Sequence, residues 1–251
     1  MQFRTYSAPN LTAVCNSGPL LLSCGAAWIT AAESISTHYR LYWLACAAGF
    51  CKVWAADMRV GLIILAAGGS ARLAQPKQLL PLRGRTLLRR AAETALASAC
   101  RPVVVVLGAQ ADLLQGQLAG LDAAVVNNTQ WRAGMGFSIR AGMAALAADR
   151  CEGVVIMLCD QPLVSARLLD QLGEIGRLHQ SGLAAAEYGG TIGVPAFFSS
   201  AFFPQLIALP AEAGAKTILL QHQAEAARVA FPEAALDIDT KEDYQRLQKY
   251  E

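Results

Sequence analysis

From Val60 onward, short apolar runs alternate with longer stretches in which apolar residues recur at helical spacing. The apolar runs are rich in Val and Ile, which is typical of strands buried on both faces of a sheet. The predicted strands are Val60–Ala67, Pro102–Leu107, Ala123–Val126, Gly153–Leu158, Leu183–Ala186 and Val194–Phe198.

The stretches between these strands have the periodicity of amphipathic helices, and Ser165 stands where a helix N-cap is expected. The predicted helices are Thr86–Ala99, Asp112–Ala119, Ser138–Ala148, the segment from Ser165 to about Gln180, Ala215–Gln223 and Lys241–Lys249. Strands that alternate with helices form βαβ units, so we predict a single doubly wound, Rossmann-like α/β domain with a mostly parallel sheet and helices on both faces. Ligands of such sheets bind beyond the carboxyl ends of the strands.

Residues 1–57 do not share this pattern. They contain four of the seven Cys and three of the four Trp, but no clean helical or strand periodicity and no catalytic motif. We therefore divide the chain into an atypical N-terminal extension, 1–57, and a main domain, 58–251. The extension is interpreted as the product of a misassigned start, with Met58 as the true first residue. The alternative is a genuine small extension that packs on the domain.

Composition narrows the class of protein. Hydrophobic residues make up 54% of the chain, charged residues 16%, and the net charge of +2 is too small to indicate a nucleic-acid partner. The seven cysteines form no C-x-x-C pair, and their odd number argues against a secreted disulfide scaffold. No apolar run reaches the roughly 20 residues of a membrane span. We expect a cytoplasmic protein that binds neither membrane nor nucleic acid.

The first predicted strand leads into a loop suited to bind phosphate. Gly68, Gly69 and Ser70 are small enough for their backbone N–H groups to approach an anion. Arg72 and Lys77 follow. The planar guanidinium of Arg72 can donate two hydrogen bonds to phosphate oxygens, and the ammonium of Lys77 supplies a compact positive charge. No acidic residue occurs between Met58 and Ala92, although that interval holds Arg59, Arg72, Lys77, Arg83, Arg85, Arg89 and Arg90. The spacing fits neither the dinucleotide-binding motif nor the P-loop.

Acidic residues follow two other segments. Asp160 ends the strand Gly153–Cys159, and Pro162 prevents the strand from continuing. A carboxylate there suits Mg²⁺, which typically takes one or two carboxylates plus substrate phosphates; the alternative is an Asp that starts a turn. In an extended segment, Asp237 and Asp239 point to one side and Ile238 to the other, so a divalent cation would relieve the repulsion between the carboxylates.

The residues after this acidic pair are predicted to be structural. Thr240 stands at the N-cap of the last helix, and Asp243 occupies the capping-box position three residues later.

The stretch L-A-A-G-G-S-A-R-L-A-Q-P-K resembles the signature L-A-A-G-x-S-x-R-M-G-x-x-K of nucleotidyltransferases related to molybdenum cofactor cytidylyltransferase. Leu73 stands in place of Met, and Ala74 in place of Gly. The resemblance implies a loop that wraps the triphosphate, with Arg72, Lys77 and Asp160 as the catalytic residues. The implied nucleotide-binding residues of this loop are Leu65, Ala66, Ala67, Gly68, Gly69, Ser70, Arg72 and Lys77.

Further segments resemble the same family across 58–251. C-D-Q-P matches its metal-binding Asp160, and L-D-I-D-T-K-E-D implies a second metal ligand, Asp239 or, as the alternative, Asp237. The stretch from Asn128 to Ser138 resembles N-x-x-W-x-x-G-M-x-x-S, which implies that Asn128, Gly134 and Ser138 lie near the nucleotide. The alternatives are a helix cap for Ser138 and a core position for Trp131. Y-G-G-T-I-G-V-P resembles the acceptor-side G-x-P segment, and P-A-E-A-G-A-K is a weakened form of G-D-x-G-A-R.

The resemblance implies Mg²⁺-dependent transfer of CMP from CTP to molybdopterin, with release of pyrophosphate. A phosphate oxygen of the acceptor attacks the α-phosphorus, so the protein needs no nucleophile of its own. A molybdoenzyme or its maturation factor is an expected partner. The alternatives are a guanylyltransferase, a sugar- or polyol-phosphate nucleotidyltransferase, and a noncatalytic nucleotide-binding module that delivers a cofactor.

Overall fold

The computed structural model describes residues 20–24, 27–31, 59–70, 73, 75–235, 237–238 and 240–247. The chain divides into two units, Met1–Asp57 and Met58–Glu251. In the first unit, β1 (Leu20–Cys24) and β2 (Ala27–Ala31) form an antiparallel pair, which the sequence pattern did not predict. Within the described part of the chain, no helix is both long and apolar enough to cross a membrane.

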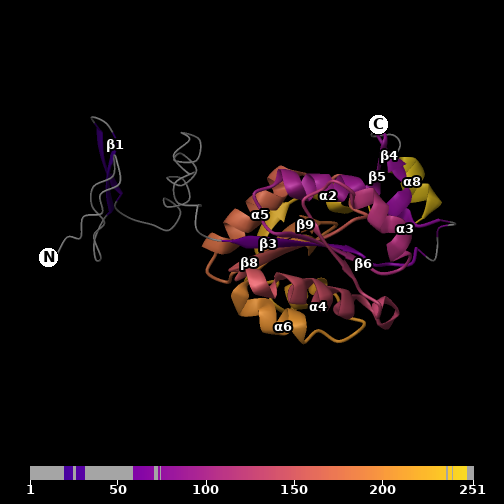
Figure 1. Ribbon diagram of the computed structural model, residues 1–251. Helices are drawn as coiled ribbons and strands as arrows, with labels where there is room; N and C mark the ends of the chain where they lie inside the picture. Colours follow the sequence, from indigo (N-terminus) through magenta and orange to yellow (C-terminus); the bar gives the residue numbers. More distant parts are fainter. Residues whose placement is uncertain are drawn as a thin grey trace. The chain divides into compact units, whose positions relative to one another are not determined.

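The second unit is built on a seven-stranded sheet with the strand order β11-β9-β10-β8-β3-β6-β7 (Figure 1). All neighbouring strands run parallel except β10, which is antiparallel to both β8 and β9. The predicted doubly wound, mostly parallel sheet is therefore confirmed. Its strands are β3 (Val60–Ala66), β6 (Val103–Leu107), β7 (Ala124–Asn127), β8 (Gly153–Leu158), β9 (Leu183–Tyr188), β10 (Thr191–Ser199) and β11 (Ala227–Ala230).

Helices cover both faces of the sheet (Figure 1). One core cluster joins Leu62 and Ile64 of β3 to α2, α3 and α5, and a second joins Ile63 and Leu65 to α4, α6 and α7. Successive residues of one strand thus serve opposite faces. The helices are α2 (Leu87–Ala97), α3 (Ala111–Gln115), α4 (Met135–Leu146), α5 (Ala166–Leu178), α6 (Phe203–Ile207), α7 (Ala215–Gln221) and α8 (Lys241–Leu247), with 3₁₀ turns η2 (Lys77–Leu79), η3 (Gly116–Leu118), η4 (Trp131–Ala133), η5 (Ala147–Asp149), η6 (Ser200–Phe202) and η7 (Pro232–Ala235).

The strands β9 and β10 form a hairpin that is longer than the two predicted strands. Gly189 and Gly190 connect them, and both have positive φ angles, 56° and 74°. Two consecutive residues with positive φ are what a tight hairpin turn requires, and glycine adopts them without steric cost. The pairing shifts register between Gly193 and Ala196.

Several short elements were not predicted, namely α6, β11 and the small hairpin of β4 (Pro81–Leu82) and β5 (Arg85–Thr86). The prediction that a helix begins at Ser138 was wrong, because α4 already begins at Met135 with Gly134 as its N-cap. Ser165, in contrast, accepts a hydrogen bond from the N–H of Leu168, as expected of an N-cap.

A third apolar cluster fixes the C-terminal segment. Leu80, Leu82 and Leu87 pack with Ile238 and Leu247, and the Tyr244 hydroxyl donates to the carbonyl of Pro81 at 2.8 Å (a contact that joins α8 to β4). The predicted capping box is confirmed. The N–H and hydroxyl of Thr240 donate to Asp243 at 3.0 and 2.7 Å, and the N–H of Asp243 donates back to the Thr240 hydroxyl.

The close approach of α5 to β10 gives a test of the packing. A Cβ added to Gly176 would lie 2.1 Å from the Cδ1 atom of Phe197, whose side chain is fully buried. We therefore expect Gly176→Ala to lower the free energy of unfolding, measured in urea, by about 1–3 kcal/mol.

Gly173 is the matched control on the same helix. Its added Cβ would meet only Val60 Cγ1, at 3.9 Å. Because alanine favours the helix by up to about 1 kcal/mol over glycine, Gly173→Ala should be neutral or stabilising. Equal losses in both variants would contradict the packing described here.

Candidate active site

The structure brings Lys77 and Asp160 together at the carboxyl edge of the sheet. Strands β3 and β8 are parallel neighbours, and Leu65 pairs with Leu158 near the end of each. Asp160 lies two residues beyond the end of β8, and Lys77 begins η2 after the glycine-rich loop. The ammonium of Lys77 contacts Oδ2 of Asp160, and the two side chains are only 15% and 10% exposed. This is a mostly buried ion pair between two loops that are far apart in the sequence.

The glycine-rich loop leaves β3 at the same edge. Leu65 and Ala66 are core residues of the strand, and Ala67 is also buried. Gly68 and Gly69 are exposed, and Ser70 is half-buried with its backbone in the left-handed region at φ 52°. Arg72, which the sequence analysis placed among the catalytic residues, lies outside the described residues.

A residue that the sequence analysis did not single out holds this loop. Gln78 is 1% exposed, and its Nε2 donates to the carbonyls of Ala66 and Gly68 at 3.0 and 2.8 Å. The Ser70 hydroxyl donates to Gln78 Oε1 at 3.3 Å and accepts from the N–H of Lys77 at 2.9 Å. In the sequence, Gln78 is a single polar residue between Lys77 and two leucines, and no motif distinguishes it.

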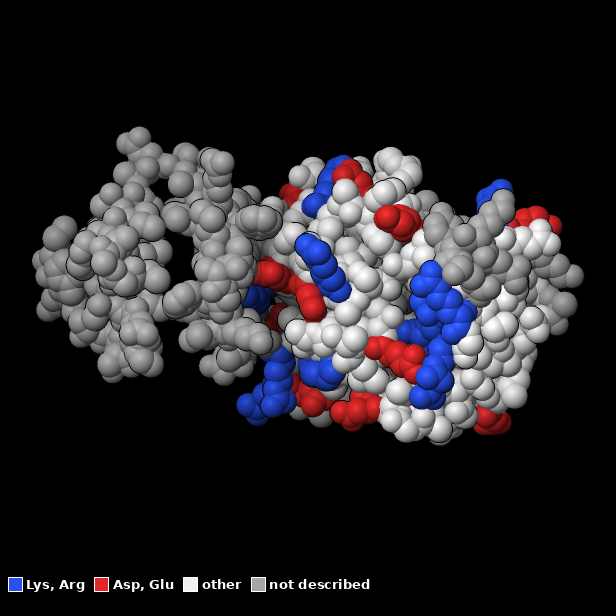
Figure 2. Space-filling model, turned by 90° about the horizontal axis from the view of Figure 1, so that it is seen from above, with Lys and Arg blue, Asp and Glu red and all other residues white. Residues whose placement is uncertain are grey.

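The basic rim inferred from charge counting is smaller in the structure. Arg85 and Arg89 both face Glu93, at 3.9 and 2.9 Å, and Arg89 also donates to the carbonyls of Gln117 and Ala119. Figure 2 shows a dense group of basic side chains with acidic ones directly beside it. These arginines hold helix α2 in place, so the counted charge overstates what faces a triphosphate.

The C-terminal acidic segment reaches the same edge. The N–H of Ile238 donates to the carbonyl of Asp160 at 3.2 Å, and the Ile238 side chain is fully buried in the third cluster. The neighbouring Asp237 has a buried Oδ1 atom. Burial raises the pKa of the Tyr188 phenol, and the charges of Asp237 and then Asp160 raise it further. Asp237 directly precedes Ile238, so the Ile238 hydrogen bond brings its segment to the loop of Asp160. Asp239, the preferred second metal ligand in the sequence analysis, lies outside the described residues.

These carboxylates fit a divalent cation. Oδ1 of Asp160 is buried and has no hydrogen-bond partner among the described residues, whereas Oδ2 accepts a hydrogen bond from the Lys77 ammonium. A buried carboxylate oxygen without a partner is costly unless a cation meets it. The described residues hold no group of three or more His, Cys, Asp or Glu able to form a protein-only metal cage. Two carboxylates completed by substrate phosphates match the preference of Mg²⁺.

The predicted acceptor segment lies beside Asp160. The carbonyl of Val194 accepts hydrogen bonds from Gln161 Nε2 at 3.0 Å and from the Tyr188 hydroxyl at 3.3 Å. A Cβ on Gly193 would lie 2.2 Å from the Tyr188 hydroxyl oxygen, so only glycine leaves room for this contact. The G-x-P segment is thereby joined to the loop that carries the metal-binding aspartate candidate.

The segment that follows β7 packs against the glycine-rich loop through Trp131. A Cβ on Gly69 would lie 3.1 Å from a ring carbon of Trp131, and one on Gly108 would lie 2.6 Å from the Trp131 Cβ. The indole is half-buried, with the Arg132 guanidinium 4.6 Å from a ring centroid. Trp131 therefore packs against the glycine-rich loop and is half-buried, so it is not a core residue.

The other residues of this segment make contacts within the segment or with the backbone near Ala211. Asn128 and Ser138 are buried, and Asn128 Nδ2 donates to the Ser138 hydroxyl at 3.0 Å. Gly134 has φ 128°, and a Cβ there would lie 2.2 Å from the carbonyl oxygen of Ala211. The N–H of Gly136 donates to that same carbonyl at 2.9 Å. The segment is therefore held to the P-A-E-A-G-A-K stretch by close backbone contact.

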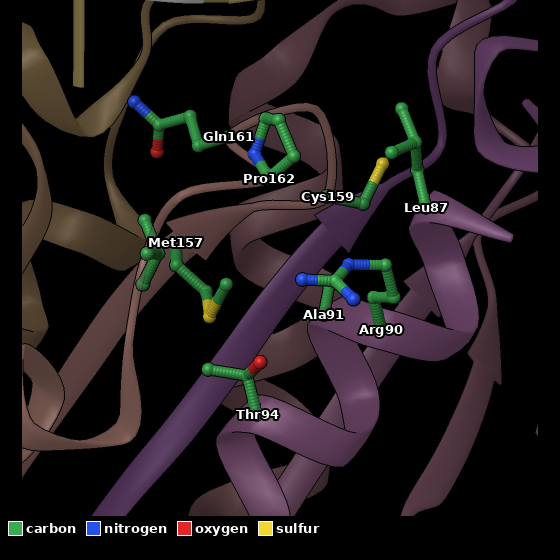
Figure 3. Close-up of a pocket in the computed structure, with 9 residues that line it drawn as sticks. Leu87, Arg90, Ala91, Thr94, Met157, Cys159, Gln161 and Pro162 are labelled. Carbon is green, nitrogen blue, oxygen red and sulfur yellow. The ribbon is translucent and has the colours of Figure 1, made fainter. Parts of the chain in front are cut away.

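A small cavity of about 10 Å³ lies behind the loop of Asp160, between α2 and the end of β8 (Figure 3). That volume holds about one water molecule, not a nucleotide. Arg90 extends from α2 into it, and the thiol of Cys159 lines it. Burial raises the pKa of Cys159 strongly, and the charge of Asp160 adds to this. The thiol therefore stays neutral, which makes it a poor nucleophile.

Comparison with known proteins decides the family. The sequence model of the family described as MobA-like NTP transferase domain matches residues 62–226. The match begins within β3 and ends between α7 and β11. The chain belongs to this family. It is a nucleotidyltransferase, and this family binds a nucleoside triphosphate and a phosphorylated acceptor, typically with a divalent metal ion.

Three curated relatives of this nucleotidyltransferase have different names. The purine catabolism protein PucB of Bacillus subtilis is 31% identical over 74% of this chain and 95% of its own length. The molybdenum cofactor cytidylyltransferase of Escherichia coli is 26% identical over 74% and 93%. Nicotine blue oxidoreductase of Paenarthrobacter nicotinovorans is 42% identical over 44% of this chain, and the match spans about half of that relative, 53%.

Solved structures agree with the family. Rv0371c from Mycobacterium tuberculosis superposes with a TM-score of 0.65 at 29% identity, over 76% of this chain and 99% of that one. A structure of Rv0371C in complex with manganese superposes with a TM-score of 0.61 at 28% identity, over the same shares of both chains.

The two carboxylates of this nucleotidyltransferase give a test by metal titration. Because the Ile238 hydrogen bond brings the segment of Asp237 to the loop of Asp160, we expect Asp160→Asn and Asp237→Asn to weaken Mn²⁺ binding at least about tenfold, measured from the electron paramagnetic resonance signal of free Mn²⁺. Asp122→Asn removes an exposed carboxylate and should leave the affinity unchanged. Wild-type affinity in Asp160→Asn would show that the ion binds elsewhere.

Proposed function

We propose that this protein transfers CMP from CTP to molybdopterin and releases pyrophosphate, with Mg²⁺ as the metal. The observation that carries the chemistry is the meeting of Lys77 with Asp160 at the carboxyl edge of the sheet, with Asp237 nearby. The choice of substrates is supported by the signature loop, the D-Q-P triplet and the full-length match to the cytidylyltransferase of Escherichia coli.

The residues of the chain divide the work as follows. The N–H groups of Gly68, Gly69 and Ser70, together with Lys77 and Arg72, hold the β- and γ-phosphates. Asp160 and Asp237 would hold Mg²⁺, with Asp239 as the alternative second ligand. When bound, this ion neutralises charge on the α-phosphate and orients the displacement. An oxygen of the acceptor phosphate forms the new bond to the α-phosphorus, the bond from that phosphorus to the bridging oxygen breaks, and pyrophosphate leaves.

Lys77 has two successive partners in this proposal. Without nucleotide, its ammonium neutralises the buried carboxylate of Asp160. On entry of the triphosphate, the ammonium moves to the phosphates, and both oxygens of the Asp160 carboxylate are then available to the metal. The positive charge then lies on the departing pyrophosphate, where negative charge builds up during the reaction.

Positioning supplies the remainder of the catalysis. Tyr188 and Gln161 hold the Val194 carbonyl, and through it the acceptor segment, beside Asp160. Holding two reactants in line is worth several orders of magnitude in rate, and this requires no nucleophile from the protein.

Substrate choice is tested by assaying the full chain with Mg²⁺ and molybdopterin against CTP, GTP, UTP and ATP in parallel. We expect pyrophosphate release with CTP to exceed that with the other nucleotides. A preference for GTP would indicate a guanylyltransferase, and turnover only with a sugar or polyol phosphate would change the acceptor. Binding of nucleotide without pyrophosphate release from any pair would indicate a noncatalytic cofactor-delivery module.

The role of Asp160 is tested separately. We expect Asp160→Ala to lower kcat at least about 100-fold, because the variant loses the carboxylate that holds the metal at the reacting phosphate. Its circular dichroism spectrum should remain that of the native fold, and Asp122→Ala should keep full activity. Full activity in Asp160→Ala would remove the metal from the proposal.

A further inference from the structure

We propose that Gln78 is the positioning residue that keeps the glycine-rich loop in its phosphate-binding conformation. This inference rests on the proposed function, because it assigns to Gln78 the job of preparing the triphosphate site. Gln78 does not itself face the nucleotide, since its side chain is 1% exposed beneath the loop.

The Gln78 carboxamide is matched to the loop at three points. A carboxamide offers two N–H donors and one oxygen acceptor. Nε2 donates to the carbonyls of Ala66 and Gly68, where the chain leaves β3, and Oε1 accepts from the hydroxyl of Ser70, two residues after Gly68. Both donors and the acceptor of a buried amide are therefore satisfied by one short stretch of backbone and its serine. Such fully satisfied buried networks rigidify the segments that they join.

The direction of these bonds determines what the loop offers to a ligand. The carbonyls of Ala66 and Gly68 are turned towards Gln78. Among the described residues, the N–H groups of Gly68, Gly69 and Ser70 donate no hydrogen bond. Successive N–H groups that are free, in a loop whose carbonyls point away, form a concave anion-binding nest. Gln78 thus turns the acceptors inward and leaves the donors for phosphate.

The same network also places Lys77. Its N–H donates to the Ser70 hydroxyl at 2.9 Å, and its ammonium contacts Asp160. Gln78 follows Lys77 directly in η2, so the residue that fixes the loop also fixes the start of the lysine side chain. Loss of the amide should therefore affect the phosphate-binding groups together, while the carboxylates of Asp160 and Asp237, which are held by β8 and the third apolar cluster, keep their places.

The test uses Gln78→Met, which keeps the length of the side chain and removes its hydrogen bonds. Dissociation constants for CTP and for inorganic tripolyphosphate are measured by isothermal titration calorimetry on the full chain, and that for Mn²⁺ by electron paramagnetic resonance. We expect the first two to rise at least about tenfold and the Mn²⁺ constant to change less than about twofold, because the loop and not the carboxylates is disturbed.

Gln117→Met is the matched control. Gln117 accepts a hydrogen bond from the Thr86 hydroxyl at 3.2 Å and lies outside the loop, so its loss should leave all three constants unchanged. Unchanged affinity for CTP and tripolyphosphate in Gln78→Met would overturn the inference. A parallel loss of phosphate and Mn²⁺ affinity would also overturn it, since that would show a general structural role.

Gln78→Asn keeps an amide and serves if the Met variant does not fold, with Gln117→Asn as its control and the same criteria. The inference can fail separately from the proposed function. If the wild-type protein forms pyrophosphate and Gln78→Met binds CTP equally well, only the role of Gln78 is wrong. If the wild type binds neither CTP nor tripolyphosphate, both are wrong.

Discussion

The ion pair between Lys77 and Asp160 is the interaction on which the rest of this site depends. Removing a carboxylate from water costs several kcal/mol unless an opposite charge or hydrogen bonds compensate it. Asp160 is nearly buried, and one of its oxygens meets an ammonium while the other has no hydrogen-bond partner within the described chain. A carboxylate satisfied on one side only is prepared to accept a metal ion on the other. The stability of the folded protein and its capacity for catalysis therefore draw on the same pair.

Three separate parts of the fold bring this pair about. The adjacent parallel strands β3 and β8 end at one edge and deliver the two loops side by side. Gln78 and Ser70 tie the glycine-rich loop to the residue that carries the ammonium. Ile238 bonds to the backbone of Asp160 and is buried under α8, so the second carboxylate arrives from the far end of the chain. Each of these connections consists of buried apolar contacts or hydrogen bonds, so the backbone that carries the charged side chains is rigid.

Much of this arrangement could be predicted from the sequence, because the central strands are buried on both faces and have an unmistakable apolar pattern. Because ligands of such sheets bind beyond the carboxyl ends of the strands, the sequence alone already indicated the loops of Lys77 and Asp160. The hairpin turn at Gly189 and Gly190 was missed, since its glycines were interpreted as part of an acceptor motif. The count of basic residues between Met58 and Ala92 overstated the positive charge available to a triphosphate, because several of these residues have partners within the protein. Arg85 and Arg89 pair with Glu93, just beyond the counted interval, and Arg89 also donates to carbonyls from distant turns, which no local pattern reveals.

A crystal structure with Mn²⁺ and a nonhydrolysable CTP analogue tests the central claim most directly, because anomalous scattering locates the ion without ambiguity. The account predicts one ion bound by the carboxylates of Asp160 and Asp237 at the carboxyl edge of the sheet, with the ammonium of Lys77 transferred to the phosphates. An ion bound away from Asp160, or a nucleotide seated at another edge while Lys77 keeps its contact with Asp160, would contradict it.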